Sequence, residues 1–335
     1  MLNYLKIFSL LLLSINPLFT LHANNTYECS EENNITLTQE DYALYSPPSW
    51  QMQLTHHTAH LAFPDTITTS LNQNKIILTI IAERKDIGAI ETYIIKPKIK
   101  SNEHTLLYIH GGAFIKAITN YHIEMLVDLA NRLGSEIYVP LYTLADNKSY
   151  PSQIDEVFDI YKYMKNQFGA ENIVVMGDSA GGTLAFNLLN RVNKSFLEQP
   201  SKLIVLSPWM NLSLDNPLIP YYDKKDLILS KIFLETSAKK YLAERYTAEN
   251  LASPDVSPIQ MNTLSELPPT LYIGGNADLF YPDSILFRDR ALEQGMDLTF
   301  ITVNGGFHVF PISPALFVPE SNIAREQMVF FINCR

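Results

Sequence analysis

The feature that most constrains this chain is the hexapeptide GDSAGG at residues 177–182, which directly follows the apolar run Ile173–Met176. The run predicts a buried strand and Thr183–Asn193 predicts a helix, so the hexapeptide forms the turn between them. Its G-x-S-x-G pattern is typical of a nucleophile elbow, a strained turn that holds a serine hydroxyl beside a helix N-terminus. We therefore expect Ser179 to be a nucleophile, the alternative being a Gly-rich turn with an exposed serine.

Strand-like and helical stretches alternate from about residue 75 onward. Several strands are continuous apolar runs, as expected for parallel strands that are buried on both faces. The alternation predicts an α/β sheet with ligands at the carboxyl ends of its strands, and the short connection between the first two strands predicts an antiparallel edge hairpin. The predicted strands are Lys75–Glu83, Ile90–Lys96, Thr105–His110, Glu136–Leu141, Ile173–Met176, Leu203–Leu206, Thr270–Ile273 and Leu298–Val303. The predicted helices are His122–Leu133, Ser152–Phe168, Thr183–Asn193 and Ser284–Glu293.

Two stretches interrupt this alternation. Residues 24–70 contain aromatic and Pro-rich elements without a strand rhythm, and residues 211–252 begin Pro- and Asp-rich and then become helical. With 335 residues, the chain is long enough for one large domain, and we expect a catalytic domain over 71–335. Residues 24–70 would add an arm to a cap over its active edge, and residues 211–252 would be a cap insertion. The alternative for both stretches is surface decoration.

The first 23 residues resemble a signal peptide. Lys6 precedes the apolar stretch Ile7–Ile15, Asn16-Pro17 interrupts it, and the small residue Ala23 stands where a signal peptidase would cut. No cysteine follows the apolar stretch directly, so no lipoprotein anchor is expected. The stretch is too short to span a bilayer comfortably, so no other stable membrane anchor is expected either. We expect cleavage near Ala23 and export to a periplasm or outside the cell, the alternative being an uncleaved anchor.

Export changes the interpretation of the two cysteines, Cys29 and Cys334. Two thiols in an oxidising compartment favour a disulfide, which would tie the N-terminal arm to the last helix. Two unpaired thiols are the alternative, because a sequence does not place the two Cα atoms within bridging distance.

Charge and histidine pattern exclude other classes of protein. A formal net charge of −10 argues against nucleic acid as a partner, because little in the chain would neutralise phosphates. The stretch from His56 to His60 has histidines four residues apart, but a zinc protease motif requires glutamate where His57 stands. We therefore expect these histidines to be solvent-exposed or packed in the cap, metal binding being the alternative. No metal and no cofactor are expected, and the sequence leaves the oligomeric state open.

Ser179 needs a base and an acid that follow it in chain order. His308 lies in a Gly-rich loop directly after the predicted strand Leu298–Val303, and we expect it to be the general base. Asp278 lies in another Gly-rich loop after the strand Thr270–Ile273, so its carboxylate would orient the imidazole. Three other aspartates lie between the predicted serine and histidine and are alternatives for the acid by chain order alone: Asp255, Asp283 and Asp289. Asp255 lies in a Ser-Pro-rich loop, and the other two lie in or beside a predicted helix.

Small residues after the third predicted strand supply candidate donors for an oxyanion. The stretch 110–114 reads His-Gly-Gly-Ala-Phe, and consecutive small side chains let backbone N–H groups point at one oxygen. The N–H that directly follows the predicted nucleophile would supply a further donor. A Gly-Gly pair by itself is usually just a turn. The predicted oxyanion-hole residues are Gly111, Gly112, Ala113 and Ala180.

Together these motifs resemble the hormone-sensitive-lipase-like branch of the α/β hydrolases. Residues 110–114 are similar to its HGG[GA]x oxyanion motif and residues 177–182 to its GDSAGG elbow. Similar stretches also occur at 150–159, 253–258 and 267–270, so the resemblance runs from about residue 75 to residue 335. It implies the α/β-hydrolase fold, a mostly parallel sheet flanked by helices with a helical cap, and carboxylesterase or lipase-like activity. It also implies that Gly112 and Ala113 are the main loop donors and that Gly111 shapes the turn.

The chain departs from that family in two places. Residues 142–147 read Tyr-Thr-Leu-Ala-Asp-Asn, where the family typically has Tyr-Arg-Leu-Ala-Pro-Glu, so local packing there differs. Ala113 replaces the commoner third glycine, and its methyl group is expected to narrow the acyl site while its N–H remains.

These observations predict a serine carboxylesterase that acts on small-molecule esters, with short- to medium-chain acyl groups, through an acyl-enzyme. The same triad could instead cleave amides or peptides, or transfer an acyl group, because the cap selects the leaving group and the acceptor. A non-catalytic ligand receptor on the same fold is a third interpretation, which the retained nucleophile and base disfavour.

Overall fold

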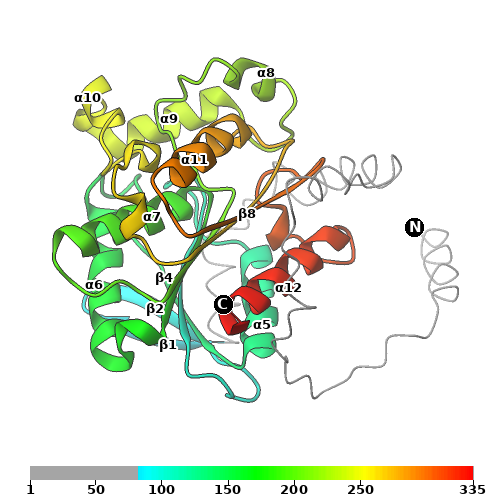
Figure 1. Ribbon diagram of the computed structural model, residues 1–335. Helices are drawn as coiled ribbons and strands as arrows, with labels where there is room; N and C mark the ends of the chain where they lie inside the picture. Colours follow the sequence, from blue (N-terminus) through cyan, green and yellow to red (C-terminus); the bar gives the residue numbers. More distant parts are fainter. Residues whose placement is uncertain (1–81, 335) are drawn as a thin grey trace, which may run out of the picture. The chain divides into compact units, whose positions relative to one another are not determined.

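An eight-stranded sheet forms the centre of the described structure, residues 82–334 of a computed structural model (Figure 1). In chain order its strands are β1 Glu83–Ile87, β2 Ile90–Ile95, β3 Thr105–Ile109, β4 Glu136–Pro140, β5 Ile173–Asp178, β6 Lys202–Leu206, β7 Thr270–Gly275 and β8 Leu298–Val303. Across the sheet they lie in the order β1-β2-β4-β3-β5-β6-β7-β8. The pairs β1–β2 and β2–β4 are antiparallel and all other neighbouring pairs are parallel. The carboxyl ends of β3, β5, β7 and β8 therefore meet at one edge.

Helices cover both faces of this sheet (Figure 1). In chain order the α-helices of the described residues are α5 Asn120–Leu133, α6 Ser152–Phe168, α7 Ser179–Lys194, α8 Ile219–Asp223, α9 Lys231–Leu242, α10 Ala248–Leu251, α11 Tyr281–Glu293 and α12 Pro319–Cys334. Side chains of each central strand alternate between two apolar cores, so that Val175 of β5 lies in one core while Val174 and Met176 lie in the other. Helices α6, α7, α9 and α11 contribute to the first core, and α5 and α12 contribute to the second. The α/β architecture predicted from the alternation is confirmed.

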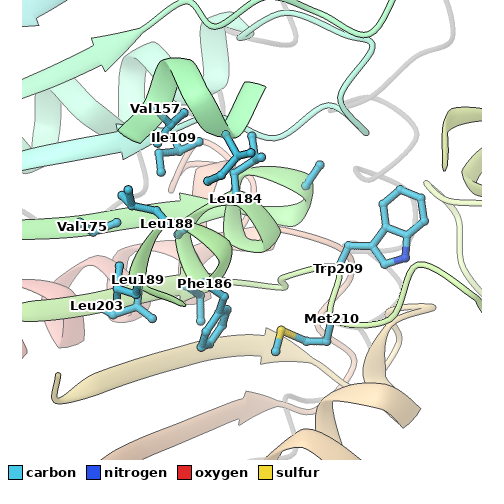
Figure 2. Packing of buried hydrophobic residues seen from close by; sticks show 14 of the residues in the cluster. Ile109, Val157, Val175, Leu184, Phe186, Leu188, Leu189, Leu203, Trp209 and Met210 are labelled. Carbon is cyan, nitrogen blue, oxygen red and sulfur yellow. The ribbon is translucent and has the colours of Figure 1, made fainter. Parts of the chain in front are cut away.

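Helix α7 fixes the position of the residue at which it begins, Ser179. Its side chains Leu184, Leu188 and Leu189 recur at helical spacing and pack among residues of β3, β5 and β6 (Figure 2). Each is fully buried, which stabilises the fold by about 1.5–3 kcal/mol per side chain. The first turn of α7 therefore has little freedom to move relative to the sheet.

The predicted edge hairpin exists, but its first strand lies further along the chain than expected. That strand is Glu83–Ile87, which pairs with β2, whereas the prediction placed it at Lys75–Glu83, most of which lies outside the described residues. Most side chains of β1 are exposed or half-buried at the edge of the sheet, so its sequence ERKDI carries no apolar run for a periodicity argument to find.

The segment 211–252 forms α8, α9 and α10 and contacts loops at the carboxyl edge of the sheet. The Tyr241 carbonyl accepts the N–H of Tyr150, and the Tyr241 ring stacks on Phe114 at 3.8 Å between centroids. Whether this segment acts as a cap stays a prediction. So does the role of residues 24–70, which lie outside the described residues together with 1–23.

Cys334 ends α12 and is disulfide-bonded. Its predicted partner, Cys29, lies outside the described residues, and the pairing stays a prediction. Within residues 82–334, no helix combines the length and the apolar character needed to cross a membrane.

The elbow between β5 and α7 requires glycine at position 181. A Cβ there would lie 2.0 Å from the carbonyl oxygen of Ile109, at the end of β3, and 2.6 Å from that of His110. Both atoms belong to the backbone, so they cannot move aside as the end of a side chain can. The elbow and the end of β3 thus approach each other as closely as two backbones allow.

We predict that Gly181→Ala lowers the free energy of unfolding by about 3 kcal/mol or more, because the added methyl forces the two backbones apart. Urea denaturation of the purified protein measures this loss. Gly295→Ala is the matched control: its φ of +73° is unfavourable for alanine, but no atom lies within 4 Å of the added Cβ. The control should cost only about 1–2 kcal/mol. Equal losses in the two variants would contradict the close-approach argument.

Candidate active site

Ser179 occupies the tip of the strand–turn–helix elbow. It follows the last residue of β5 and has a φ of +50°, a left-handed conformation that non-glycine residues rarely adopt. Its carbonyl accepts the N–H of Trp209 at 3.0 Å, which ties the strained turn to the loop after β6. Strain of this kind persists only where the surroundings hold it, and it is a frequent property of functional sites.

The structure brings the three predicted triad residues into one hydrogen-bonded chain. His308 Nε2 lies 3.0 Å from Ser179 Oγ, and His308 Nδ1 lies 3.0 Å from Asp278 Oδ2. The other carboxylate oxygen of Asp278 accepts the N–H of Phe280 at 2.9 Å. All three side chains are buried, so bulk water does not compete for these contacts.

The loops that carry Asp278 and His308 are joined to each other. The Asn276 amide donates to Asn304 Oδ1 at 2.8 Å, and its Oδ1 accepts the N–H of Gly305 at 2.7 Å. The N–H of Ala277 donates to the carbonyl of Gly306 at 3.0 Å. These bonds extend the β7–β8 pairing beyond the strands, so that the two loops hold the acid and the base at a fixed separation.

His308 lies among carboxylates that favour its charged form. Burial by itself would lower its pKa, but the negative charge and the hydrogen bond of Asp278, together with smaller effects of Asp226 and Asp178, raise the pKa above its ordinary value. A base with a raised pKa takes a proton from a serine hydroxyl more readily once it is in its neutral form. The Phe280 ring contacts the imidazole edge to face at 5.2 Å and helps to fix its plane.

The predicted oxyanion residues divide into two groups. The N–H of Gly111 donates to Asp178 Oδ1 at 2.8 Å, so it is already occupied and shapes the loop. Within the described residues, the N–H groups of Gly112 and Ala113 donate no hydrogen bond, and that of Ala180 lies in the first turn of α7, where helices leave N–H groups unpaired. Gly112 has a φ of +109°, which requires glycine. Three N–H groups thus remain for an oxyanion.

Sequence analysis did not assign a role to Asp178, the residue before the predicted nucleophile. Besides Gly111, its carboxylate accepts the Tyr108 hydroxyl at 2.6 Å and lies 3.2 Å from His122 Nε2. Burial would raise its pKa, but His122, Tyr108 and the Gly111 N–H together hold the pKa below its ordinary value. An ionised, fully hydrogen-bonded Asp178 therefore locks the oxyanion loop to the elbow. Its place inside the GDSAGG motif was a signal for this role, whereas His122 gave none.

The stretch that departs from the family pattern supports the same loop. The Tyr142 ring stacks on the His110 ring at 4.3 Å between centroids, and the Tyr142 hydroxyl donates a hydrogen bond to the His110 carbonyl at 2.8 Å. The N–H of Ala145 donates to the Phe114 carbonyl at 2.8 Å. Glu156 accepts from both the N–H and the hydroxyl of Thr143, so a carboxylate from α6 orders this stretch.

The competing acids lie in other environments. Asp255 accepts from Asn190 and Lys194, and Asp289 pairs with Arg288. Asp283 is buried and accepts from Asn216 at 2.8 Å, away from the His308 imidazole nitrogens. The stretch from His56 to His60 lies outside the described residues, and no cluster that could hold a metal occurs among those that are described.

A mostly parallel sheet, a serine on a strand-to-helix elbow and an Asp–His pair that follows it in chain order are the architecture of an α/β hydrolase. The chain belongs to the α/β-hydrolase-fold family, whose model matches residues 106–312. This confirms the family and the fold that the motifs predicted.

Individual relatives agree with this assignment. An esterase of Acinetobacter venetianus is 32% identical over 227 residues, which cover 68% of this chain and 73% of the relative. An acetyl-hydrolase of Streptomyces hygroscopicus is 24% identical, with 63% and 69% covered. The crystal structure of a hormone-sensitive lipase from a metagenome library has a TM-score of 0.73 and covers 86% of this chain and 99% of its own, at 22% identity. That likeness shows a shared fold.

We predict that two buried histidines titrate in opposite directions. His308 should titrate above 6.5, the ordinary value, while burial lowers the pKa of His110 to about 4. An NMR titration of the imidazole C–H resonances measures both, with His308→Gln and His110→Asn used for assignment. If His308 titrated at or below 6.5, the carboxylates would not act on it as described.

We also predict that Asp283→Asn stabilises the protein at neutral pH. Among the described residues, Asp283 Oδ2 has no hydrogen-bond partner, and burial raises the pKa of Asp283 from 3.8 to about 6. A raised folded-state pKa favours folding below pH 3.8, and that contribution is lost as the pH rises through about 6. Near pH 7 the asparagine variant should therefore be more stable by up to about 3 kcal/mol.

Thermal melts of wild type and Asp283→Asn between pH 4 and pH 8 measure this difference, which should grow with pH. Asp215→Asn is the control with the opposite sign, because hydrogen bonds from Ser213 and Asn211 lower the pKa of Asp215. This variant should lose stability relative to wild type above the ordinary carboxyl pKa. A pH-independent difference for Asp283→Asn would contradict the prediction.

Proposed function

We propose that this protein is a serine carboxylesterase that hydrolyses small-molecule esters with short- to medium-chain acyl groups. The observation that carries the proposal is the continuous chain from Ser179 Oγ through the His308 imidazole to Asp278, with both contacts at 3.0 Å. In this proposal Ser179 is the nucleophile, His308 the general base and Asp278 the residue that orients the imidazole. The names of the relatives, an esterase and an acetyl-hydrolase, support the same chemistry.

The first half of the reaction forms an acyl-enzyme. Ser179 Oγ attacks the ester carbonyl carbon while His308 Nε2 takes the hydroxyl proton. The carbonyl π electrons move to the oxygen, and the N–H groups of Gly112, Ala113 and Ala180 bind the resulting oxyanion. When the carbonyl re-forms, the bond to the alcohol oxygen breaks, and the leaving alkoxide takes the proton from His308.

The second half returns the free enzyme. A water molecule gives a proton to His308 Nε2 and attacks the acyl carbon, which again places an oxyanion at the same N–H groups. Collapse breaks the bond to Ser179 Oγ, which recovers its proton from His308, and the carboxylic acid leaves. Asp278 accepts the Nδ1–H throughout and stabilises the imidazolium that forms twice per turnover.

Buried aromatic side chains beside the oxyanion loop support a small, apolar acyl site. The Phe114 ring stacks on Tyr241 and lies 5.8 Å from the Trp209 ring between centroids. The Trp209 ring in turn stacks on Phe280 at 5.6 Å between centroids. All four rings are buried. Rings that already fill this space favour short- to medium-chain acyl groups over long ones, and the Ala113 methyl group narrows the site further.

Amide or peptide hydrolysis and acyl transfer are the alternatives that use the same groups. Each needs the same nucleophile and base and differs only in the leaving group or acceptor that reaches the acyl carbon. The intact Ser–His–Asp chain speaks against the third alternative, a non-catalytic ligand receptor.

Export is part of the proposal. The signal-peptide pattern of residues 1–23 favours a periplasmic or secreted enzyme, and a disulfide at Cys334 is typical of proteins in oxidising compartments. Mass spectrometry of the mature protein recovered from the culture medium or periplasm, with an N-terminus near residue 24, tests this.

We predict that the mature protein hydrolyses p-nitrophenyl esters and that Ser179→Ala lowers kcat/KM by at least about a thousandfold. The variant removes only a hydroxyl, so its thermal melt should match that of wild type and report an intact fold. The rate should fall as the acyl chain lengthens from acetyl to dodecanoyl. Equal turnover by wild type and Ser179→Ala across this series would refute the esterase function. Faster cleavage of the matching p-nitroanilides, or ester formation with added alcohol in place of hydrolysis, would select an alternative on the same triad.

A further inference from the structure

A second carboxylate, that of Asp226, lies next to the Asp278 loop and has no role in the reaction described above. Asp226 lies in the segment 211–252, between α8 and α9. Its Oδ1 accepts the N–H groups of Ile228 at 2.7 Å and Leu229 at 2.8 Å, which closes a local turn. Its Oδ2 accepts the N–H of Leu279 at 2.6 Å. Because Leu279 directly follows Asp278, one carboxylate joins the segment 211–252 to the loop of the triad acid.

We propose that Asp226 is a positioning residue for this active site: it holds the Asp278 loop in place against His308, and its charge is a second negative charge acting on the imidazole. The local turn needs only one of its two oxygens, so the other is free to reach across to Leu279. When turnover is measured, this role rests on the proposed function. When the pKa of the His308 imidazole is measured instead, the role can be tested without it.

Few other contacts join this segment to the triad loops. Tyr221 and Tyr222 of α8 face Asn276 and Asn304 of the two loops across a cavity of about 530 Å³. Beside the cavity, the Tyr222 ring contacts the Tyr281 ring at 5.9 Å between centroids. The Asp226–Leu279 hydrogen bond is a second and direct link between the segment 211–252 and the Asp278 loop.

The charges around the His308 imidazole and the Asp226 carboxylate support an electrostatic role. The charged groups that act on His308 are Asp278, Asp226 and Asp178, and all three favour the imidazolium. Two charged groups act on Asp226: Asp278 opposes its ionisation, and His308 favours it. Burial and Asp278 raise the pKa of Asp226 to about 6. Above that pH Asp226 is ionised, and it stabilises the imidazolium that forms during catalysis.

The attraction between Asp226 and the imidazolium should then change the acid dissociation constant of His308 and kcat by the same factor. Asp226→Asn removes the charge and keeps the size, so the pKa of His308 in the resting protein should fall by about 0.5–1 unit. The same loss acts on the imidazolium in the transition state, so kcat for p-nitrophenyl acetate should fall about 3- to 10-fold with KM within about twofold. NMR titration of the His308 resonance gives the first number and steady-state kinetics the second. The pH at which kcat/KM is half-maximal should move down together with the NMR value.

Asp223→Asn is the matched control. Asp223 lies three residues earlier in the same segment, accepts the N–H of Lys231 at 2.6 Å, and loses the same charge in the variant. Among the described residues, no hydrogen bond or ion pair joins Asp223 to either triad loop, so its variant should leave the His308 pKa within about 0.2 unit of wild type. Asp226→Glu keeps the charge, so the pKa of His308 in this variant should stay close to that of wild type. This variant separates the effect of the charge from any general effect on folding. Thermal melts of all variants report their folding.

The outcomes decide between two roles. If Asp226→Asn lowers kcat but leaves the His308 titration unchanged, Asp226 is a structural link only and the electrostatic role is overturned. If neither quantity changes, the positioning role is overturned as well. If wild type shows no turnover, the proposed function fails, and the NMR shift still decides whether Asp226 acts on His308.

Discussion

The hydrogen bond from the Gly111 N–H to Asp178 is the interaction on which the catalytic edge of this sheet depends. It joins the loop after β3 to the elbow after β5, two elements that also approach so closely at Gly181 that no side chain fits between them. With the Gly111 N–H occupied, the loop turns so that the next two N–H groups remain unpaired within the described residues. The site is thus held by one buried anion that Tyr108 and His122 keep hydrogen-bonded.

The two buried His–Asp pairs illustrate how similar groups acquire different roles. His308 has one nitrogen on Asp278 and the other on the Ser179 hydroxyl, so a proton can move from serine to imidazole. His122 has one nitrogen near Asp178 and the other on Thr119, at 2.6 Å from its hydroxyl oxygen, in a capping box at the start of α5. That pair has no reacting atom beside it and serves to hold a loop. The partner of the second nitrogen, rather than the His–Asp contact itself, separates the two roles.

Much of this could be predicted from sequence because the relevant signals are local. Buried parallel strands read as apolar runs, and the Gly-rich turns after β5, β7 and β8 mark the ends of those strands, which is enough to place Ser179, Asp278 and His308 at one edge. The edge strand β1 was misplaced because its exposed side chains carry no apolar pattern. His122 and Asp226 went unrecognised because their contacts join residues far apart in the chain, and neither lies in a motif.

Buried carboxylates in this site differ in whether their partners outweigh the effect of burial on their pKa. Asp178, under the nucleophile, has three partners and a lowered pKa, as a permanent anion requires. Asp226 and Asp283, where the segment 211–252 meets the loop and helix that follow β7, keep pKa values raised to about 6 because burial outweighs their hydrogen bonds. The carboxylate under the nucleophile is therefore the one whose partners favour its charged form. The junction with the segment 211–252 carries an electrostatic cost near neutral pH, which packing elsewhere must offset. At that junction the negative charge of Asp226 acts on the His308 imidazole.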